Sequence, residues 1–205
     1  DDFQDFNRER LIPHKMSTPG PSLAVGDVNG DGLQDVFIGG AMGQTGAVFL
    51  QNKASNFSKM ATSVFEADKA NEDTGATFFD ADGDGDQDLL VASGGSTNTA
   101  GSATYESRLY LNSDGKGNFS RSPNFPKIPE SCTAVSVFDF DKDGDLDVFL
   151  AGAVVPGSWP ISPKSYVLKN EKGVFGDVTA DFAPDFSKIG MIKALEWADL
   201  DGDKT

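Results

Sequence analysis

The stretch that decides the fold is Asp27-Val28-Asn29-Gly30-Asp31-Gly32-Leu33-Gln34-Asp35. It recurs as Asp80-Ala81-Asp82-Gly83-Asp84-Gly85-Asp86-Gln87-Asp88 and again as Asp139-Phe140-Asp141-Lys142-Asp143-Gly144-Asp145-Leu146-Asp147. A fourth copy begins at Asp199-Leu200-Asp201-Gly202-Asp203, and the sequence ends within it. Because the copies begin at residues 27, 80, 139 and 199, the period is 53 to 60 residues. A nearly fixed period of this size is typical of an array of similar structural units.

Short apolar runs surround each copy at corresponding positions. One run precedes the copy, at residues 22–25, 76–79 and 135–138, and a second follows it, at 36–40, 89–92 and 148–152. A third run, at 48–52, 109–112 and 166–170, ends in Asn each time, and a fourth starts at Phe57, Phe119 and Phe175. The runs are rich in Val, Leu, Phe and Tyr and are bounded by Gly, Asn and Asp, which is typical of β-strands. No helical periodicity of ten residues or more is sustained anywhere.

Four short strands per unit, repeated at one period, predict an all-β fold built as a β-propeller fragment. We expect a single incomplete domain over residues 1–205, with three four-stranded blades at 20–70, 71–130 and 131–188. Residues 189–205 would begin a fourth blade, with its first strand at 194–197. The N-terminal residues 1–19 would supply a strand, because Phe3-Gln4-Asp5-Phe6 resembles the fourth strand of a preceding blade. The chain therefore reads as a piece of a longer protein.

The spacing of the acidic residues predicts calcium sites in the loops between the first and second strands. In such a loop the side chains at positions one, three and five converge, and Gly at position six permits the sharp turn. Dense oxygen ligands suit calcium, which accepts six to eight of them, whereas crowded carboxylates repel without a cation. Position seven would contribute its backbone carbonyl, since Leu33 stands where the other copies have Asp. The candidate ligands are Asp27, Asn29, Asp31, Leu33 and Asp35; Asp80, Asp82, Asp84, Asp86 and Asp88; Asp139, Asp141, Asp143, Asp145 and Asp147; and a truncated fourth site at Asp199, Asp201 and Asp203.

Two other interpretations of the loops are weaker. An EF-hand needs Glu at position twelve, but position twelve is Ile38, Val91 and Leu150, each within an apolar run. Ordinary Asp-Gly turns could explain one copy. Three complete copies at one period argue against that explanation for the set.

The loop sequence, followed by a run ending near Gly-Gly-Ala or Ala-Gly-Ala, resembles the FG-GAP/VCBS repeat of integrin α-subunit propellers and of many secreted bacterial proteins. The likeness covers roughly residues 20–205. It implies one calcium ion per loop, between the first and second strands of a blade, and an extracellular or cell-surface location. It carries no enzyme activity with it. The chain departs from the family in completeness, since integrin-like propellers close with seven blades.

Composition excludes several other classes of function. Asp and Glu number 32 against 17 Lys and Arg, and the net charge of −15 disfavours nucleic-acid binding. Cys132 is the only cysteine and His14 the only histidine, so disulfides, a Cys-rich or His-rich zinc site and a Ser-His-Asp triad are disfavoured. We interpret Cys132 as a small buried hydrophobe. No segment is long and apolar enough to span a membrane.

A ligand face is expected opposite the calcium loops, where the connections between second and third strands vary most. The connection at 94–107 carries Tyr105, and the connection at 153–164 carries Trp159 among several prolines. A Trp on a Pro-stiffened loop can anchor a sugar or a protein, and the competing interpretation is that it packs on a neighbouring blade.

These observations favour a calcium-stabilised extracellular or cell-surface propeller segment that binds protein or carbohydrate, with a structural metal and no catalytic residues. The alternatives are a scaffold part of a larger secreted polysaccharide-degrading enzyme, and a spacer without a ligand. Because three blades leave two open flanks, self-association of the segment is also expected.

Overall fold

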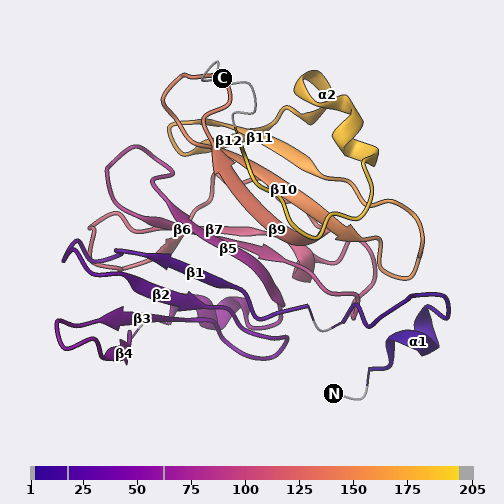
Figure 1. Cartoon of the computed structure of the whole chain (residues 1–205), viewed down its shortest axis with the longest axis horizontal. Helices are drawn as coiled ribbons and strands as arrows, with labels where there is room; N and C mark the ends of the chain where they lie inside the picture. Colours follow the sequence, from indigo (N-terminus) through magenta and orange to yellow (C-terminus); the bar gives the residue numbers. More distant parts are fainter. Residues whose placement is uncertain (1–2, 18, 62, 199–205) are drawn as a thin grey trace.

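The computed structural model describes residues 3–17, 19–61 and 63–198, and it is an all-β fold of three four-stranded antiparallel sheets. The sheets follow one another along the chain, from the indigo first sheet to the orange third sheet in Figure 1. The predicted all-β class and the four strands of each complete unit are therefore confirmed. The truncated fourth copy, with Asp199, Asp201 and Asp203, lies outside the described residues.

Each sheet is a simple meander in which consecutive strands pair. The first sheet contains β1 Leu23–Gly26, β2 Asp35–Ile38, β3 Ala47–Gln51 and β4 Phe57–Lys59. The second contains β5 Asp73–Phe79, β6 Asp88–Ser93, β7 Arg108–Leu111 and β8 Ser120–Arg121. The third contains β9 Ser131–Phe138, β10 Asp147–Val154, β11 Tyr166–Glu171 and β12 Val174–Asp177. The helices are short: α1 Asp5–Arg8, α2 Thr179–Phe182, and the 3-10 turns η1 Val64–Asp68, η2 Ala103–Tyr105 and η3 Pro184–Lys188.

Two apolar clusters join the sheets, because alternate residues of the second sheet face opposite ways. The first strands of the three sheets lie side by side in chain order, because β1 contacts β5 and β5 contacts β9. The cluster toward the first sheet contains Ala24, Val28, Phe37, Val48, Phe65, Phe78, Leu89, Val91, Tyr110 and Phe119. The cluster toward the third contains Phe79, Ala81, Leu90, Ala92, Leu109, Phe125, Ile128, Cys132, Val148, Leu150, Leu168 and Phe175. Burial raises the pKa of the Cys132 thiol to about 12, which agrees with its interpretation as a small buried hydrophobe.

A buried polar group lies where the second sheet begins. Asp73 forms an ion pair with Arg108, both side chains being almost fully shielded, and its Oδ2 accepts a hydrogen bond of 2.8 Å from the Gly40 N–H. The neighbouring Glu72 is also buried. Burial, together with the negative charges of Asp5 and Asp73, raises the pKa of Glu72 to about 7, against the hydrogen bond from the Gly20 N–H.

The meander places the two kinds of connection at opposite edges of the molecule. The acidic loops at 27–35, 80–88 and 139–147 each join the first strand of a sheet to the second, so they lie at one edge. The connections between second and third strands lie at the other edge, on the same side as the helix α1 (Figure 1). One edge therefore carries the candidate metal ligands, and the other carries the variable connections.

The N-terminal prediction was wrong, because Asp5–Arg8 forms the helix α1 and the described part of residues 1–19 contains no strand. Asp5 explains the difference, since its buried carboxylate anchors the segment by hydrogen bonds. It accepts from the Met16 N–H at 2.9 Å, the Ser17 hydroxyl at 2.5 Å and the Ser96 hydroxyl at 3.1 Å. The segment is held by side-chain contacts to the second sheet and does not pair with a strand.

The predicted strand at 194–197 is also absent from the described residues, which are irregular there. Trp197 stacks on Phe138 of the third sheet, with ring centroids 5.1 Å apart, and Phe186 packs on Phe149 at 5.1 Å. The C-terminal segment therefore covers the outer face of the third sheet (Figure 1). The outer face of the first sheet remains exposed at Leu23, Val25, Ile38 and Phe57. The expectation of two bare flanks is thus wrong for the third sheet.

Candidate metal centre

The three complete loops share one backbone conformation, which the carboxylate at position one organises. Asp27 accepts hydrogen bonds of 2.8 Å from the N–H groups of Gly30 and Gly32. Asp80 accepts in the same way at 2.8 Å and 3.0 Å, and Asp139 at 3.0 Å from position six. The position-six glycines have φ of 82°, 91° and 97°, a left-handed conformation that disfavours any side chain. The glycine is therefore required by the turn.

The carboxylate at position nine ties each loop to the third strand of its own sheet. Asp35, Asp88 and Asp147 have exposed fractions of 0%, 1% and 1%. In each, Oδ2 accepts from the N–H of position two, at 3.1, 2.8 and 3.1 Å. Oδ1 accepts from the third strand, at 2.8 Å from the N–H groups of Gln51, Asn112 and Asn170. Every position-nine side chain is thus fixed before any ion is considered.

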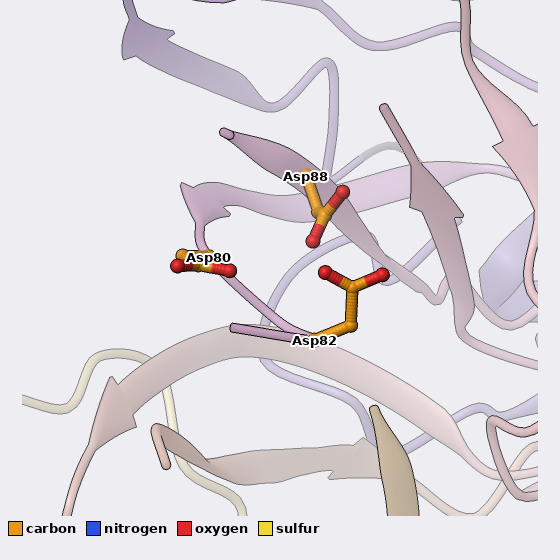
Figure 2. Close-up of side chains that lie close together, drawn as sticks. All are labelled: Asp80, Asp82 and Asp88. Carbon is orange, nitrogen blue, oxygen red and sulfur yellow. The ribbon is translucent and has the colours of Figure 1, made fainter. Parts of the chain in front are cut away.

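Positions one, three and nine bring their carboxylates together in the second and third loops. Oxygens of Asp80, Asp82 and Asp88 all lie within 4.8 Å of one another, as do those of Asp139, Asp141 and Asp147. Figure 2 shows the carboxylates of Asp82 and Asp88 turned toward each other, with Asp80 beside them. In the first loop Asn29 occupies position three, and its amide oxygen accepts from the Asp31 N–H at 3.0 Å.

The electrostatics of the loops suit a bound cation. Burial raises the pKa of Asp88 to about 6, and the negative charges of Asp82 and Asp84 add to the increase. Burial and then the charge of Asp84 raise the pKa of Asp82. Asp82 Oδ1 and Asp139 Oδ1 are shielded from solvent and have no hydrogen-bond partner in the described structure. Hard carboxylate oxygens that are crowded and unpartnered fit a divalent cation such as calcium.

The remaining predicted ligand positions are engaged differently. At position five, Oδ1 of Asp31, Asp84 and Asp143 accepts from the N–H of position seven, at 2.9, 2.9 and 3.0 Å. At position seven, Asp145 Oδ2 accepts from the Lys172 N–H at 3.0 Å. Leu33 and Asp86 occupy the same place in the other loops. Positions five and seven therefore lie beside the converging carboxylates and are not members of the groups above.

The asparagines at the ends of the third apolar runs link neighbouring sheets. Asn112 Nδ2 donates to the carbonyl of Val28, in the first loop, at 2.8 Å. Asn170 Nδ2 donates to the carbonyl of Ala81, in the second loop, at 2.9 Å. The Asn that ends the third apolar run in each repeat was the sequence feature that pointed to these residues. In the first sheet the equivalent position is Gln51 and not Asn52, because Gln51 donates its N–H to the position-nine Asp.

Lys169, which looks from the sequence like a solvated residue, contacts the third loop. Its Nζ forms an ion pair with Asp141 Oδ2 and lies 3.2 Å from Asp143 Oδ2. Hydrogen bonds to these two carboxylates raise the pKa of Lys169. No feature of the sequence around Lys169 indicates that its side chain reaches across to the loop.

On the opposite edge, the two predicted ligand-face aromatics are partly or wholly occupied by packing. Tyr105 is 1% exposed, and its hydroxyl accepts from the N–H of Asn98 and donates to the carbonyl of the same residue, both at 2.9 Å. The ring of Tyr105 is therefore not available to a ligand. Trp159 is half-buried and packs against a small cluster of Ile12, Met16, Ala153 and Val154.

Residues 5–17, which we call the N-terminal bracket, connect the loops of the second and third sheets. Arg8 Nη1 donates to the three successive carbonyls of residues 96–98, at 2.6, 3.1 and 2.8 Å. Glu9 accepts from the N–H groups of Gly157 at 2.6 Å and Trp159 at 2.9 Å. The bracket thus fixes the two variable connections relative to each other.

A cavity of about 300 Å³ lies beside the bracket. Its ionisable lining residues are all basic: His14, Lys15 and Lys193. Met16, Ala153 and Val154 form an apolar part of the wall. Cations gathered around one cavity stand out in a chain with a net charge of −15.

Comparison with models of protein families identifies a repeat in this chain. The sequence model of a protein family described as an FG-GAP-like repeat matches residues 22–91 and 92–150, which is more than half of the 205 residues and includes the three complete loops. No curated protein matches the chain. Within the described residues, none of the helices has the length and apolar character needed to cross a membrane.

Proposed function

The chain belongs to the FG-GAP-like repeat family, and on that premise we propose that it is a calcium-stabilised β-propeller segment that binds protein or carbohydrate outside the cell. The three sheets are its blades, at residues 20–70, 71–130 and 131–188. The segment has no catalytic role of its own. Its acidic loops are structural, and its opposite edge carries the ligand.

The observation that carries the proposal is the repeated meeting of carboxylates from positions one, three and nine. In the second loop Asp80, Asp82 and Asp88 would hold the ion, with Asp84 and the position-seven carbonyl completing the oxygen shell. The equivalent residues would do so in the other loops. A calcium ion would supply the positive charge that lets the crowded carboxylates stay ionised.

The loop residues themselves explain why the metal is structural and not catalytic. Position one holds the turn, and position nine fastens the turn to the third strand. Neutralising these carboxylates therefore stabilises the junction between the first three strands of each sheet. A structural site is closed by protein oxygens, whereas a catalytic metal keeps a position open to substrate.

The calcium affinity expected for these loops fits an extracellular location. Calcium loops of extracellular modules bind with dissociation constants of about 10⁻⁴ to 10⁻³ M, and loops rich in carboxylates reach lower values. Such sites fill where free calcium is abundant. The expected range for these loops, roughly micromolar to millimolar, suits a secreted or cell-surface protein.

The cavity beside the N-terminal bracket is the best candidate for the ligand face. It is of the size expected for a small ligand group, roughly 300 Å³ or more. Lys15 and Lys193 approach it from opposite ends of the chain. Carboxylate or sulfate groups on a glycan or protein would be attracted there. An array of acidic and neutral oligosaccharides would show preferential binding of the acidic members, lost in Lys15→Glu/Lys193→Glu. Binding of neither class would count against the carbohydrate part of the proposal.

Calcium titration of the intact chain tests the metal part. We expect about three ions bound per chain by calorimetry, and a melting temperature that rises with calcium and falls with chelator. At calcium concentrations about 100 times Kd, each site adds about 2.7 kcal/mol to the free energy of unfolding. Asp82→Ala should remove the calcium-dependent gain in stability of one site, because Asp82 Oδ1 has no hydrogen-bond partner in the described structure and is free to bind the ion. Asp185→Ala, which removes an exposed acid outside the loops, is the control. A melting temperature indifferent to calcium would refute the proposal.

A further inference from the structure

Lys169 places a positive charge in the third acidic loop, where the proposed calcium ligands lie. It follows Leu168 on β11, and the next residue, Asn170, is fixed by its N–H bond of 2.8 Å to Asp147. The Lys169 ammonium contacts Asp141 at position three and lies 3.2 Å from Asp143 at position five. Of the ion pairs in the described part of the chain, those that reach a loop carboxylate both come from Lys169.

The other two sheets have an uncharged residue at the same place. The backbone bond to the position-nine Asp aligns Asn170 with Asn112 and Gln51, so Lys169 corresponds to Leu111 and Leu50. Leu50 packs against the cluster between the first and second sheets, and Leu111 against the cluster between the second and third. The third sheet therefore exchanges an apolar contact for a cation directed at its own loop.

We propose that Lys169 is a built-in counter-cation that holds the third loop when calcium is absent and weakens its affinity for calcium. The inference rests on the proposed calcium function and adds a ranking of the sites. The second loop fills first, and the third fills at higher calcium concentration. The chain would thus respond to calcium in two steps.

The second and third loops are a matched pair for this argument. Both have five aspartates, at positions one, three, five, seven and nine. Both bring positions one, three and nine together within the same limit of 4.8 Å. Calcium affinity depends on the number of ligand charges and on the rigidity of the site. The third loop also has Lys142 at position four, where the second has Gly83, but Lys142 is exposed and the ion pairs to the loop carboxylates come from Lys169. The Lys169 ammonium is therefore the added charge that contacts the proposed ligands.

The competition is direct because the lysine and the ion would use the same carboxylate, that of Asp141. A calcium ion coordinated by Asp141 would stand close to the ammonium group, and like charges at that distance repel. Asp141 must therefore release Lys169 before it can serve as a ligand. The free energy of the lost ion pair is subtracted from the free energy of calcium binding.

Glycine amides at position six report each loop separately in the intact chain. The N–H groups of Gly85 and Gly144 each donate to the position-one carboxylate at 3.0 Å, so they sense its coordination. In a calcium titration followed by ¹⁵N–¹H correlation spectra, we expect the Gly144 midpoint at about tenfold higher calcium than the Gly85 midpoint, a typical size for such coupling. Lys169→Met should bring the two midpoints together.

Two further variants separate the charge from general effects. Lys188→Met removes an equal charge from an exposed position on η3 and should leave the difference between the midpoints in place. Lys169→Arg keeps the charge and should retain most of the difference between the Gly85 and Gly144 midpoints. Melting temperatures provide a second readout: Lys169→Met should lower the value in chelator and enlarge the gain on adding calcium. If Lys169 had only a packing role, Lys169→Met would lower the melting temperatures in chelator and in calcium equally.

The outcomes distinguish this inference from the function on which it rests. Coincident midpoints for Gly85 and Gly144 in the wild type, or an unchanged difference in Lys169→Met, would overturn the role of Lys169 and leave the calcium function standing. If neither glycine responds to calcium, the proposed function itself fails.

Discussion

Replacing Asn112 by Ala should reveal how strongly one sheet holds the acidic loop of the sheet before it. The Asn112 side chain is fully buried and makes three main-chain contacts that Ala cannot make, of which the one from Nδ2 to the Gln87 carbonyl, at 3.2 Å, is only partly buried. Its Nδ2 donates to the Val28 carbonyl at 2.8 Å, and its Oδ1 accepts from the Gly117 N–H at 2.7 Å. The substitution therefore leaves a carbonyl of the first loop and an amide of the β7–β8 turn without partners.

The expected loss in the free energy of unfolding follows from the two buried groups that the substitution leaves without a hydrogen-bond partner. A buried donor or acceptor left without a partner costs about 1–3 kcal/mol, so the two buried groups cost about 2–6 kcal/mol together. That is a large fraction of the roughly 5–15 kcal/mol by which domains are stable. Asn170→Ala should behave alike, since its side chain bonds the Ala81 carbonyl and the Gly173 N–H.

Gln51 supplies the matched control for urea unfolding followed by circular dichroism. It occupies the same place in the first sheet, and the described residues before that sheet form no sheet that Gln51 could reach, so Gln51→Ala should cost less than about 1 kcal/mol. Equal losses in all three variants would refute the reasoning. So would an Asn112→Ala loss below about 1 kcal/mol, because the inter-sheet bond would then contribute no more than a surface contact.

Three further outcomes are expected. Asp73→Ala leaves the buried Arg108 charge unpaired and should cost about 3–5 kcal/mol in urea unfolding, while Asp73→Ala with Arg108→Met should recover part of it. Glu72 has its pKa raised to about 7, so it is protonated in both states below about pH 4.5 and is ionised at a cost in the folded state above pH 7. Glu72→Gln should therefore gain about 3 kcal/mol of stability at pH 8 and almost nothing at pH 4.5, and a constant gain across that range would contradict this origin. Sedimentation should show concentration-dependent association through the exposed face of the first sheet, and Leu23→Lys/Val25→Lys should abolish it. Association that persists in this variant would show that the face is not involved.

The strands could be predicted because each repeats a local pattern. A short apolar run after or before an Asp-Gly loop forms a strand in all three units, and the position-six glycines fix the turns whatever surrounds them. The convergence of Asp82 and Asp88 was predictable for the same reason, since both lie within nine residues of one chain segment.

The rest depends on contacts between distant residues, which the local pattern does not contain. Phe3-Gln4-Asp5-Phe6 has strand-like composition, but burial of Asp5 against Ser96 decides its conformation. Tyr105 looked like a ligand anchor because it lies in a long connection, yet its hydroxyl closes that connection on itself. Lys169 and Asn112 owe their roles to sheet pairing, which sets the loop that each side chain can reach.

The N-terminal bracket has a consequence for how the molecule unfolds. In a simple repeat array each unit touches only its neighbours along the chain, so units can melt one at a time. Arg8 and Glu9 skip the first sheet and bond to the second and third, across 88 to 150 positions of sequence. Melting either of those sheets breaks the bracket, and losing the bracket frees both variable connections at once. The second and third sheets should therefore behave as one cooperative unit. Among the described residues the first sheet is joined to the rest through its face with the second, so unfolding should begin there.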